Sequence, residues 1–199
     1  MTVYYNNRPR FEAVSRFAED AEMLIPKRGT AASAGYDFVV AEDIVVPPYL
    51  HMMNDWQCLI EKENSFDEPN IELKGIYTPR TLSQMAELTK ATKIKPTLVS
   101  SGVKCEIPSN MYLELSVRSS TPLKYWLIMA NSVGIIDADY YNNPDNEGEI
   151  FFQMINLSPF PIQLHKGDKI GQGIFKEYRI AADDNAKGNR TGGFGSTSK

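Results

Sequence analysis

The sequence predicts an all-β domain, an antiparallel sandwich or barrel, that carries one helical insertion. Residues 111–117 alternate between apolar and polar side chains, which is the period of a half-buried strand. Other short apolar runs are separated by Gly and Pro, as expected for many short antiparallel strands. Residues 51–95 instead place apolar side chains at helical spacing, so we interpret them as an insertion into a single domain of residues 1–199.

Composition limits the class of protein. Hydrophobic residues make up 42% of the chain, enough to bury a core, and the net charge of −4 gives no general attraction to nucleic acid. No apolar run is long enough to span a membrane, and residues 1–8 lack the apolar core of a signal peptide. Cys58 and Cys105 form neither a metal-binding spacing nor a disulfide framework, so we expect a reduced, cytoplasmic protein. A zinc site of the cytidine-deaminase kind is excluded.

The elements before the insertion are short. Residues 11–17 are predicted as the first strand, and residues 34–40 as a second that ends before Pro47-Pro48. Within the insertion, the first helix is predicted from apolar residues three or four apart: Leu50, Met53, Trp56 and Ile60. Thr78-Pro79 is predicted as the N-terminus of a second helix. We expect a helical hairpin whose apolar stripes pack against each other, with a role that the sequence does not encode.

Strand patterns resume after the insertion. Residues 123–130 are so apolar that we expect them to be buried. The remaining strands are predicted at residues 97–108, 111–117, 150–157, 162–164 and 169–175.

Residues 131–140 form a short apolar run, broken by Gly134 and closed by two carboxylates and a tyrosine. A glycine inside a strand often marks a place where a ligand approaches the backbone. Asp137 directly follows Ile135 and Ile136, so we expect its carboxylate to be partly desolvated, which tunes such a group for proton transfer. Taken alone, the segment is also compatible with a hairpin that has a polar end.

Five segments, in order, resemble the motifs of the trimeric dUTP diphosphatase (dUTPase) family. They are residues 34–40, 118–120, 131–140, 167–172 and 192–197, and together they extend over most of the chain outside the insertion. The resemblance implies a jelly-roll-like β domain that assembles as a homotrimer with active sites shared between subunits. It also implies an enzyme that hydrolyses dUTP to dUMP and pyrophosphate through attack of water on the α-phosphorus.

The central motif implies the base, sugar and catalytic contacts. By resemblance, Asp137 activates the attacking water and Tyr140 packs under the deoxyribose. Uracil is read by a side chain and nearby backbone: Asn131, Gly134, Ile135 and Ile136.

Phosphate and metal contacts are implied by three other motifs. Arg118, Ser119 and Ser120 place a guanidinium and two hydroxyls at a strand end, which suits a phosphate chain. Gln172 is implied beside the phosphates, and its strand parity with Ile170 predicts an inward-facing amide. Asp37 is implied to hold, through water, a Mg²⁺ ion bound to the triphosphate.

Residues 181–199 have the composition of a flexible C-terminal arm. By resemblance this arm closes over the site of a neighbouring subunit, where Phe194 stacks on the base. Arg190 is the counterpart of a residue that pairs with the γ-phosphate, although it stands one residue closer to Phe194 than in the family pattern. Glycine backbone and hydroxyl groups would donate to phosphate: Gly195, Ser196 and Thr197.

Two other interpretations stay open. The dCTP deaminases share the fold, but they need a glutamate on the strand after the central motif, where this chain has Gln153, which cannot shuttle a proton. A regulator that binds dUTP could use the insertion to bind a protein partner. The effect of the turn at residues 141–147, longer than in the family, also stays open.

Overall fold

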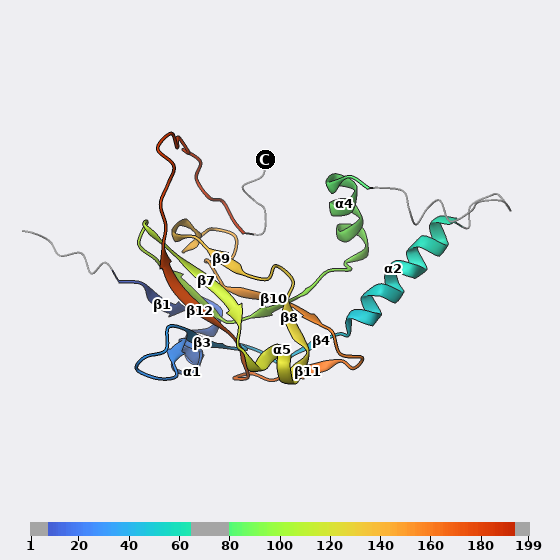
Figure 1. Ribbon diagram of the computed structural model, residues 1–199, viewed down its shortest axis with the longest axis horizontal. Helices are drawn as coiled ribbons and strands as arrows, with labels where there is room; N and C mark the ends of the chain where they lie inside the picture. Colours follow the sequence, from blue (N-terminus) through green and yellow to red (C-terminus); the bar gives the residue numbers. More distant parts are fainter. Residues whose placement is uncertain (1–7, 65–79, 194–199) are drawn as a thin grey trace, which may run out of the picture.

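The computed structural model describes residues 8–64 and 80–193 and shows an antiparallel β domain with a helical insertion (Figure 1). The larger sheet has five strands in the order β2 (Lys27–Arg28), β3 (Tyr36–Val39), β12 (Lys169–Glu177), β7 (Met111–Val117) and β9 (Gly134–Ile136). The second has the order β5 (Thr97–Ser100), β10 (Phe151–Asn156) and β8 (Leu127–Met129). Two strand pairs complete the domain: β1 (Arg10–Ala13) with β6 (Val103–Glu106), and β4 (Ile44–Val46) with β11 (Ile162–Leu164). The predicted all-β class is confirmed.

The helical elements lie at the edges of the sheets and in the insertion. Among the described residues they are η1 (Ser15–Asp20), α1 (Ala21–Leu24), α2 (Tyr49–Asn64), α4 (Leu82–Thr92), α5 (Ser120–Tyr125) and η2 (Ala138–Tyr140). The first predicted strand is therefore shorter than expected, because the chain turns into η1 directly after Val14. In the described part of the chain, none of the helices combines the length and the apolar character that a membrane span requires.

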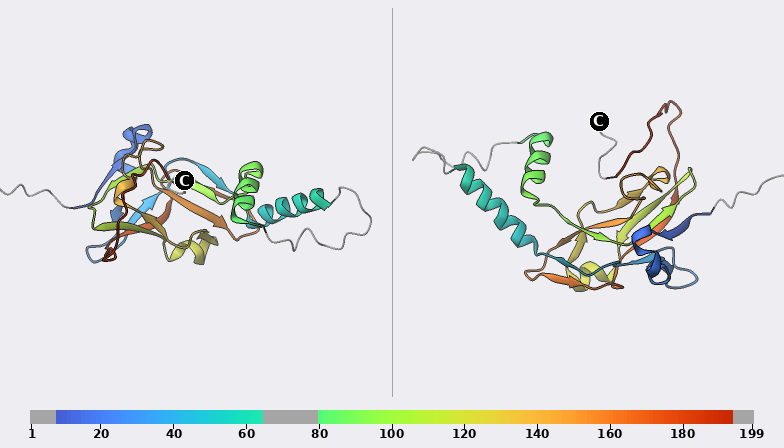
Figure 2. Two further views of the ribbon diagram at one scale, coloured as in Figure 1. Left: turned by 90° about the horizontal axis from the view of Figure 1, so that it is seen from above. Right: turned by 180° about the vertical axis from the view of Figure 1, so that it is seen from behind.

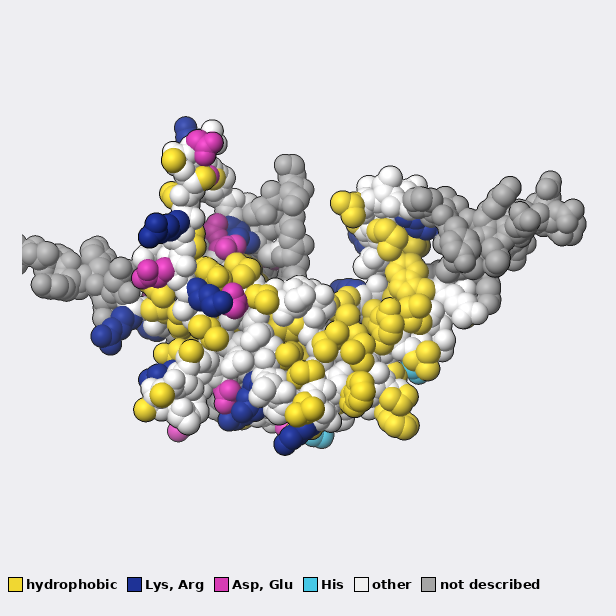
Figure 3. All heavy atoms as spheres, in the orientation of Figure 1, with side chains coloured by type: hydrophobic (Ala, Val, Ile, Leu, Met, Phe, Trp, Pro, Cys, Tyr) yellow, Lys and Arg dark blue, Asp and Glu magenta, His cyan; other side chains and the backbone are white. Residues whose placement is uncertain are grey.

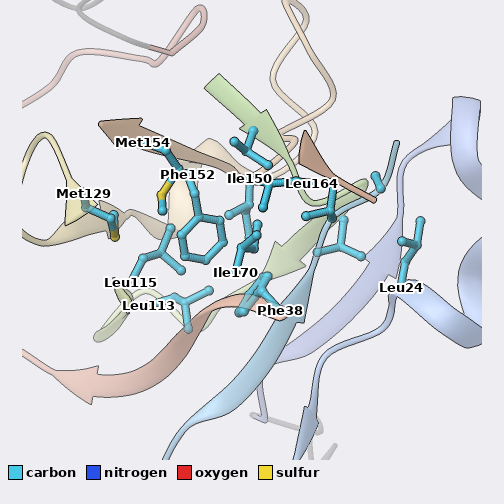
Figure 4. Close-up of a cluster of buried hydrophobic side chains, with 14 of the residues drawn as sticks. Leu24, Phe38, Leu113, Leu115, Met129, Ile150, Phe152, Met154, Leu164 and Ile170 are labelled. Atoms are coloured by element: carbon cyan, nitrogen blue, oxygen red, sulfur yellow. The ribbon is translucent and has the colours of Figure 1, made fainter. Parts of the chain in front are cut away.

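Side chains from both sheets and both strand pairs meet in one core (Figure 4). Leu113 and Leu115 of β7 are fully buried, whereas the alternate residues of the strand are only partly covered, as the period of two predicts. The Phe38 ring of β3 meets the Phe152 ring of β10 edge to face at a centroid distance of 5.5 Å. This contact joins the larger sheet to the second sheet.

A bulge in β12 reverses the expected direction of Gln172. The pairing of β12 with β3 shifts between Lys169 and Gly171. A Cβ atom on Gly171 would lie 2.1 Å from Phe152 Cε1, so position 171 faces the core and leaves no room for a side chain. Gln172 therefore faces outward, where its Nε2 donates to the Val117 carbonyl at 3.4 Å. The prediction of an inward amide, based on parity with Ile170, is wrong.

The described part of the insertion is helical, as predicted, but helices α2 and α4 extend away from the sheet instead of forming a packed hairpin (Figures 1 and 2). Helix α4 begins after Thr81, whose hydroxyl accepts from the Gln84 N–H while the Gln84 side chain accepts from the Thr81 N–H. This capping box replaces the predicted start at Thr78-Pro79, residues that lie outside the described part.

Most apolar side chains of these helices are exposed within the described chain, and Trp56 and Leu88 are only partly buried, so the expected packing of stripe against stripe is wrong. Leu82 is 92% exposed, and Leu50 and Met53 of α2 are also exposed. Figure 3 shows hydrophobic side chains gathered over α2 and α4. The expected burial of residues 123–130 holds for β8 but is wrong for α5 and the residue after it: Leu123, Tyr125 and Trp126 are exposed.

Because α4 buries no side chain, we expect the insertion to contribute little to the stability of the β domain. Deletion of residues 56–90, closed by a short glycine linker, should leave the melting temperature within a few degrees of the parent, since the entropy of loop closure grows slowly with loop length. Thermal melting and size-exclusion chromatography would measure this. A variant that aggregates or changes its oligomeric state would place the helices in an assembly interface instead.

Candidate active site

A cavity of about 210 Å³ lies between β9, β10 and the C-terminal segment. The structure brings the predicted residues of the central motif to its wall: Asn131, Gly134, Ile135, Ile136, Asp137 and Tyr140. Arg190, the predicted arm residue, lines the same cavity together with Gly193. Three further residues line the cavity although the sequence did not predict them as pocket residues: Leu115, Phe151 and Gln153.

Strand β9 positions this motif. It pairs with β7 through Gly134 opposite Leu115 and Ile136 opposite Leu113. A Cβ on Gly134 would lie 3.2 Å from the Leu115 side chain, so glycine allows β9 to lie close to β7. Because β9 is at the edge of its sheet, one row of its backbone N–H and C=O groups is not used in strand pairing. Asp137 follows as the residue before the 3-10 turn η2.

The turn at residues 141–147 holds Tyr140 in place. The buried Tyr140 hydroxyl donates to the Glu149 carbonyl at 2.9 Å and accepts from Asn146 Nδ2 at 2.8 Å. Asn143 Nδ2 donates both to the Tyr140 carbonyl and to Asn146 Oδ1. Burial raises the pKa of the Tyr140 phenol, so it stays neutral near neutral pH. The longer turn, whose effect the sequence left open, thus supports the tyrosine.

Glu149 fixes the other side of this network. Its buried carboxylate accepts from the Arg16 guanidinium at 2.8 Å and from the Ser100 hydroxyl. Because both partners come from other parts of the chain, the carbonyl that receives the Tyr140 hydroxyl is held in place. In the sequence, the density of Asn, Pro and Asp predicted a turn here. It did not predict that Arg16 and Ser100 would contact Glu149.

Arg190 connects the C-terminal segment to the central motif. Its Nη2 lies 2.5 Å from Asp137 Oδ2, and its Nε lies 2.7 Å from Asp139 Oδ1. A Cβ on Gly193 would lie 3.0 Å from the Tyr140 ring, so this segment passes directly over the tyrosine of its own chain, whereas the arm was expected to close over the site of a neighbouring subunit. Partial burial lowers the pKa of Arg190, but the bonds and charges of Asp139 and Asp137 outweigh it and raise the pKa. Asp139 was not predicted as a site residue.

Asp137 itself is 52% exposed within one chain. The expected desolvation of its carboxylate by Ile135 and Ile136 is therefore wrong for the isolated chain. The other predicted arm residues lie outside the described part: Phe194, Gly195, Ser196 and Thr197.

A second group of predicted residues gathers around Asp37. The Arg118 Nε lies 3.0 Å from Asp37 Oδ1, and the Lys169 Nζ lies 2.8 Å from Asp37 Oδ2. Gln172 stands opposite Asp37 in the pairing of β12 with β3. Two cations beside one carboxylate leave this group with an excess positive charge, which favours an anionic ligand. Lys169 was not predicted, although it lies inside the segment that carries Gln172.

A cavity of about 270 Å³ adjoins this group and is lined by Arg118, Ser120 and Lys169 among others. Ser119 is exposed between the two lining residues Arg118 and Ser120. The hydroxyls of the predicted Arg-Ser-Ser motif therefore lie at or beside this cavity.

The two groups stand far apart within one chain. Ile136, the neighbour of Asp137, pairs with Leu113, and Arg118 follows Leu113 by five residues along β7. At roughly 3.4 Å per residue, the backbone of Ile136 and the backbone of Arg118 are about 17 Å apart. The structure thus assembles two half-sites and does not bring Asp137 to Arg118 or Asp37.

Comparison with known proteins gives consistent matches. The dUTPase family model matches residues 81–198. The deoxyuridine 5'-triphosphate nucleotidohydrolase of Lactococcus lactis subsp. lactis is 35% identical over 189 residues, which are 94% of this chain and 95% of that protein. A crystal structure of dUTPase from Streptococcus mutans has a TM-score of 0.61 and 31% identity, covering 86% of this chain and 97% of that one. A dUTPase from phage phi11 of S. aureus, at 16% identity and a TM-score of 0.54, shares the fold over 92% of this chain and 97% of its own.

Proposed function

The chain belongs to the dUTPase family and hydrolyses dUTP to dUMP, and we propose that water attacks the α-phosphorus directly with Asp137 as the general base. Asp137 lies at the rim of the first cavity, next to Tyr140. A base and sugar held in this cavity would present the α-phosphate to water beside the carboxylate. Pyrophosphate would leave toward cationic groups that neutralise its charge.

The separation of about 17 Å between the two half-sites carries the second part of the proposal. A general base and the groups that hold the phosphates have to lie within a few ångströms of the same reacting atoms. We therefore propose a homotrimer in which the Asp137 cavity of one subunit faces Arg118, Ser120 and Gln172 of the partner subunit. Exposed apolar side chains on α5 support assembly, since they have no cover within the described chain.

Asp37 fits the proposed Mg²⁺ ion. Within residues 8–64 and 80–193 there is no cluster of three Asp, Glu, His or Cys side chains that could hold a metal ion alone. Magnesium keeps several waters and commonly takes one carboxylate together with substrate phosphates, which suits Asp37 beside a triphosphate. When bound, the ion would neutralise phosphate charge, while Arg118 and Lys169 orient the Asp37 carboxylate.

Two organisational features complete the proposal. Residues 1–199 form one domain, of which residues 51–95 are an insertion and residues 181–199 an arm over the site. Both cysteines are free thiols, Cys58 exposed and Cys105 buried, which supports a reducing, cytoplasmic location.

One assay tests the reaction. Pyrophosphate release should be fast with dUTP and slow with UTP, dCTP and dTTP, and it should require Mg²⁺. Ammonia release from dCTP would instead favour the deaminase interpretation, and tight dUTP binding without turnover would favour a regulator.

Mixed trimers test the shared site. Asp137→Asn and Arg118→Ala should each be nearly inactive alone, because each damages one half of every site. After the two proteins are unfolded together and refolded, some interfaces combine two intact halves, and activity should return to a substantial fraction of the parent. A mixture that stays as inactive as its components would contradict sites shared between subunits.

A further inference from the structure

Gln153 occupies a position in the wall of the first cavity that the proposed mechanism does not use. Its neighbours Phe152 and Met154 point into the core, so the Gln153 side chain projects from the other face of β10. Its carbonyl accepts from the Ala130 N–H at 2.8 Å, and the residue pairs with Leu98 of β5. The backbone under this side chain is therefore fixed from both sides.

The Gln153 carboxamide forms no hydrogen bond with any residue in the described part of the chain. The side chain is partly buried and lines the cavity near Asn131, Gly134 and Ile136. A partly buried amide normally has partners, because its two donors and its acceptor oxygen are costly to leave unpaired. An amide fixed on a central strand and directed at a cavity is suited to a ligand that carries donors and acceptors on one edge.

We propose that Gln153 reads the pyrimidine edge of the substrate: its Nε2 donates to uracil O4 and its Oε1 accepts from uracil N3–H. This inference rests on the proposed function, in which the same cavity holds the base. Uracil presents a donor and an acceptor side by side, and a carboxamide matches that pair with two hydrogen bonds. A neutral side chain also avoids repelling O4, which a carboxylate at this position would do.

Because the base lies away from the bond that breaks, the contact should act on binding. Gln153→Met keeps the length of the side chain and removes both hydrogen bonds, so it should raise KM for dUTP by roughly 10- to 100-fold with little change in kcat. Gln153→Glu keeps the shape, but it replaces the donor to O4 with a negative oxygen, so it should raise KM further. Melting temperatures of both variants should stay near that of the parent.

An altered nucleotide identifies the partner atom. In 4-thio-dUTP the oxygen O4 is replaced by sulfur, a weaker hydrogen-bond acceptor, so the parent should prefer dUTP by kcat/KM. Gln153→Met should lose most of this preference, since the contact that distinguishes oxygen from sulfur is gone, and the four measurements form a double-mutant cycle.

The results separate the two proposals. A parent protein that fails to hydrolyse dUTP overturns the proposed function itself. If the parent is active, an unchanged KM in Gln153→Met, or an undiminished preference for dUTP over 4-thio-dUTP in that variant, overturns the role of Gln153. A preserved preference for oxygen would assign O4 recognition to another group, such as the unpaired edge of β9.

Discussion

Asp137→Asn should lower kcat for dUTP hydrolysis by roughly 10²- to 10⁴-fold, the usual contribution of a positioned general base, and leave dUTP binding nearly intact. Asparagine has the same shape as aspartate but cannot accept the proton from water. Position 137 lies at the rim of the first cavity and is half exposed, so the substitution disturbs no packing. Single-turnover pyrophosphate release and the dissociation constant for dUTP would measure the two quantities separately.

Asp139→Asn is the matched control for this prediction. Arg190 pairs with both carboxylates, so either substitution weakens the hold on the arm. Only Asp137 is proposed to take a proton, and the loss of kcat in Asp139→Asn should therefore be less than about tenfold. Equal losses in the two variants would show that Asp137 acts by placing Arg190, and near-normal turnover of Asp137→Asn would remove it from the mechanism.

Local patterns predicted the β domain and the central motif because these features depend on nearby residues. The alternation in residues 111–117 was enough to identify β7, and the resemblance of residues 131–140 to a family motif located one cavity wall. The helices of the insertion followed from apolar spacing for the same reason. Their boundaries did not, because the capping box at Thr81 competes with the equally plausible Thr78-Pro79.

Features that depend on distant residues were not predicted. A one-residue bulge after Lys169 turned the Gln172 side chain away from the core, and no simple pattern in a single sequence predicts such a bulge. The support of Tyr140 depends on Glu149 and, through it, on Arg16, which is more than a hundred residues away. The mostly exposed apolar stripes of the insertion were predicted to pack against each other because periodicity identifies an apolar face without identifying what covers it.

The C-terminal arm begins at the first of the two separated half-sites. Residues 190–193 already lie over the first cavity, with Arg190 beside Asp137 and Gly193 against Tyr140. We propose that the residues that follow Gly193 in the sequence contact phosphates held by the other half-site. Closing such a site removes bulk water and strengthens the charge contacts inside it.

Truncation after Asn189 should therefore lower turnover by about 10²-fold or more, comparable to the loss of a set of donors to a developing negative charge. The melting temperature should change by no more than a few degrees, because most of residues 181–193 are exposed. The ion pairs of Arg190 involve exposed carboxylates, so each pair contributes about 1 kcal/mol or less.

Truncation after Gly193 is the matched variant, since it keeps Arg190 and the contact with Tyr140 but removes Phe194 to Lys199. If Phe194 stacks on the base and the following Gly, Ser and Thr donate to phosphate, this shorter truncation should already lose most of the activity. A full rate in the truncation after Gly193, with a loss only after Asn189, would assign the role of the arm to Arg190 alone. A full rate in both would show that the arm has no part in turnover.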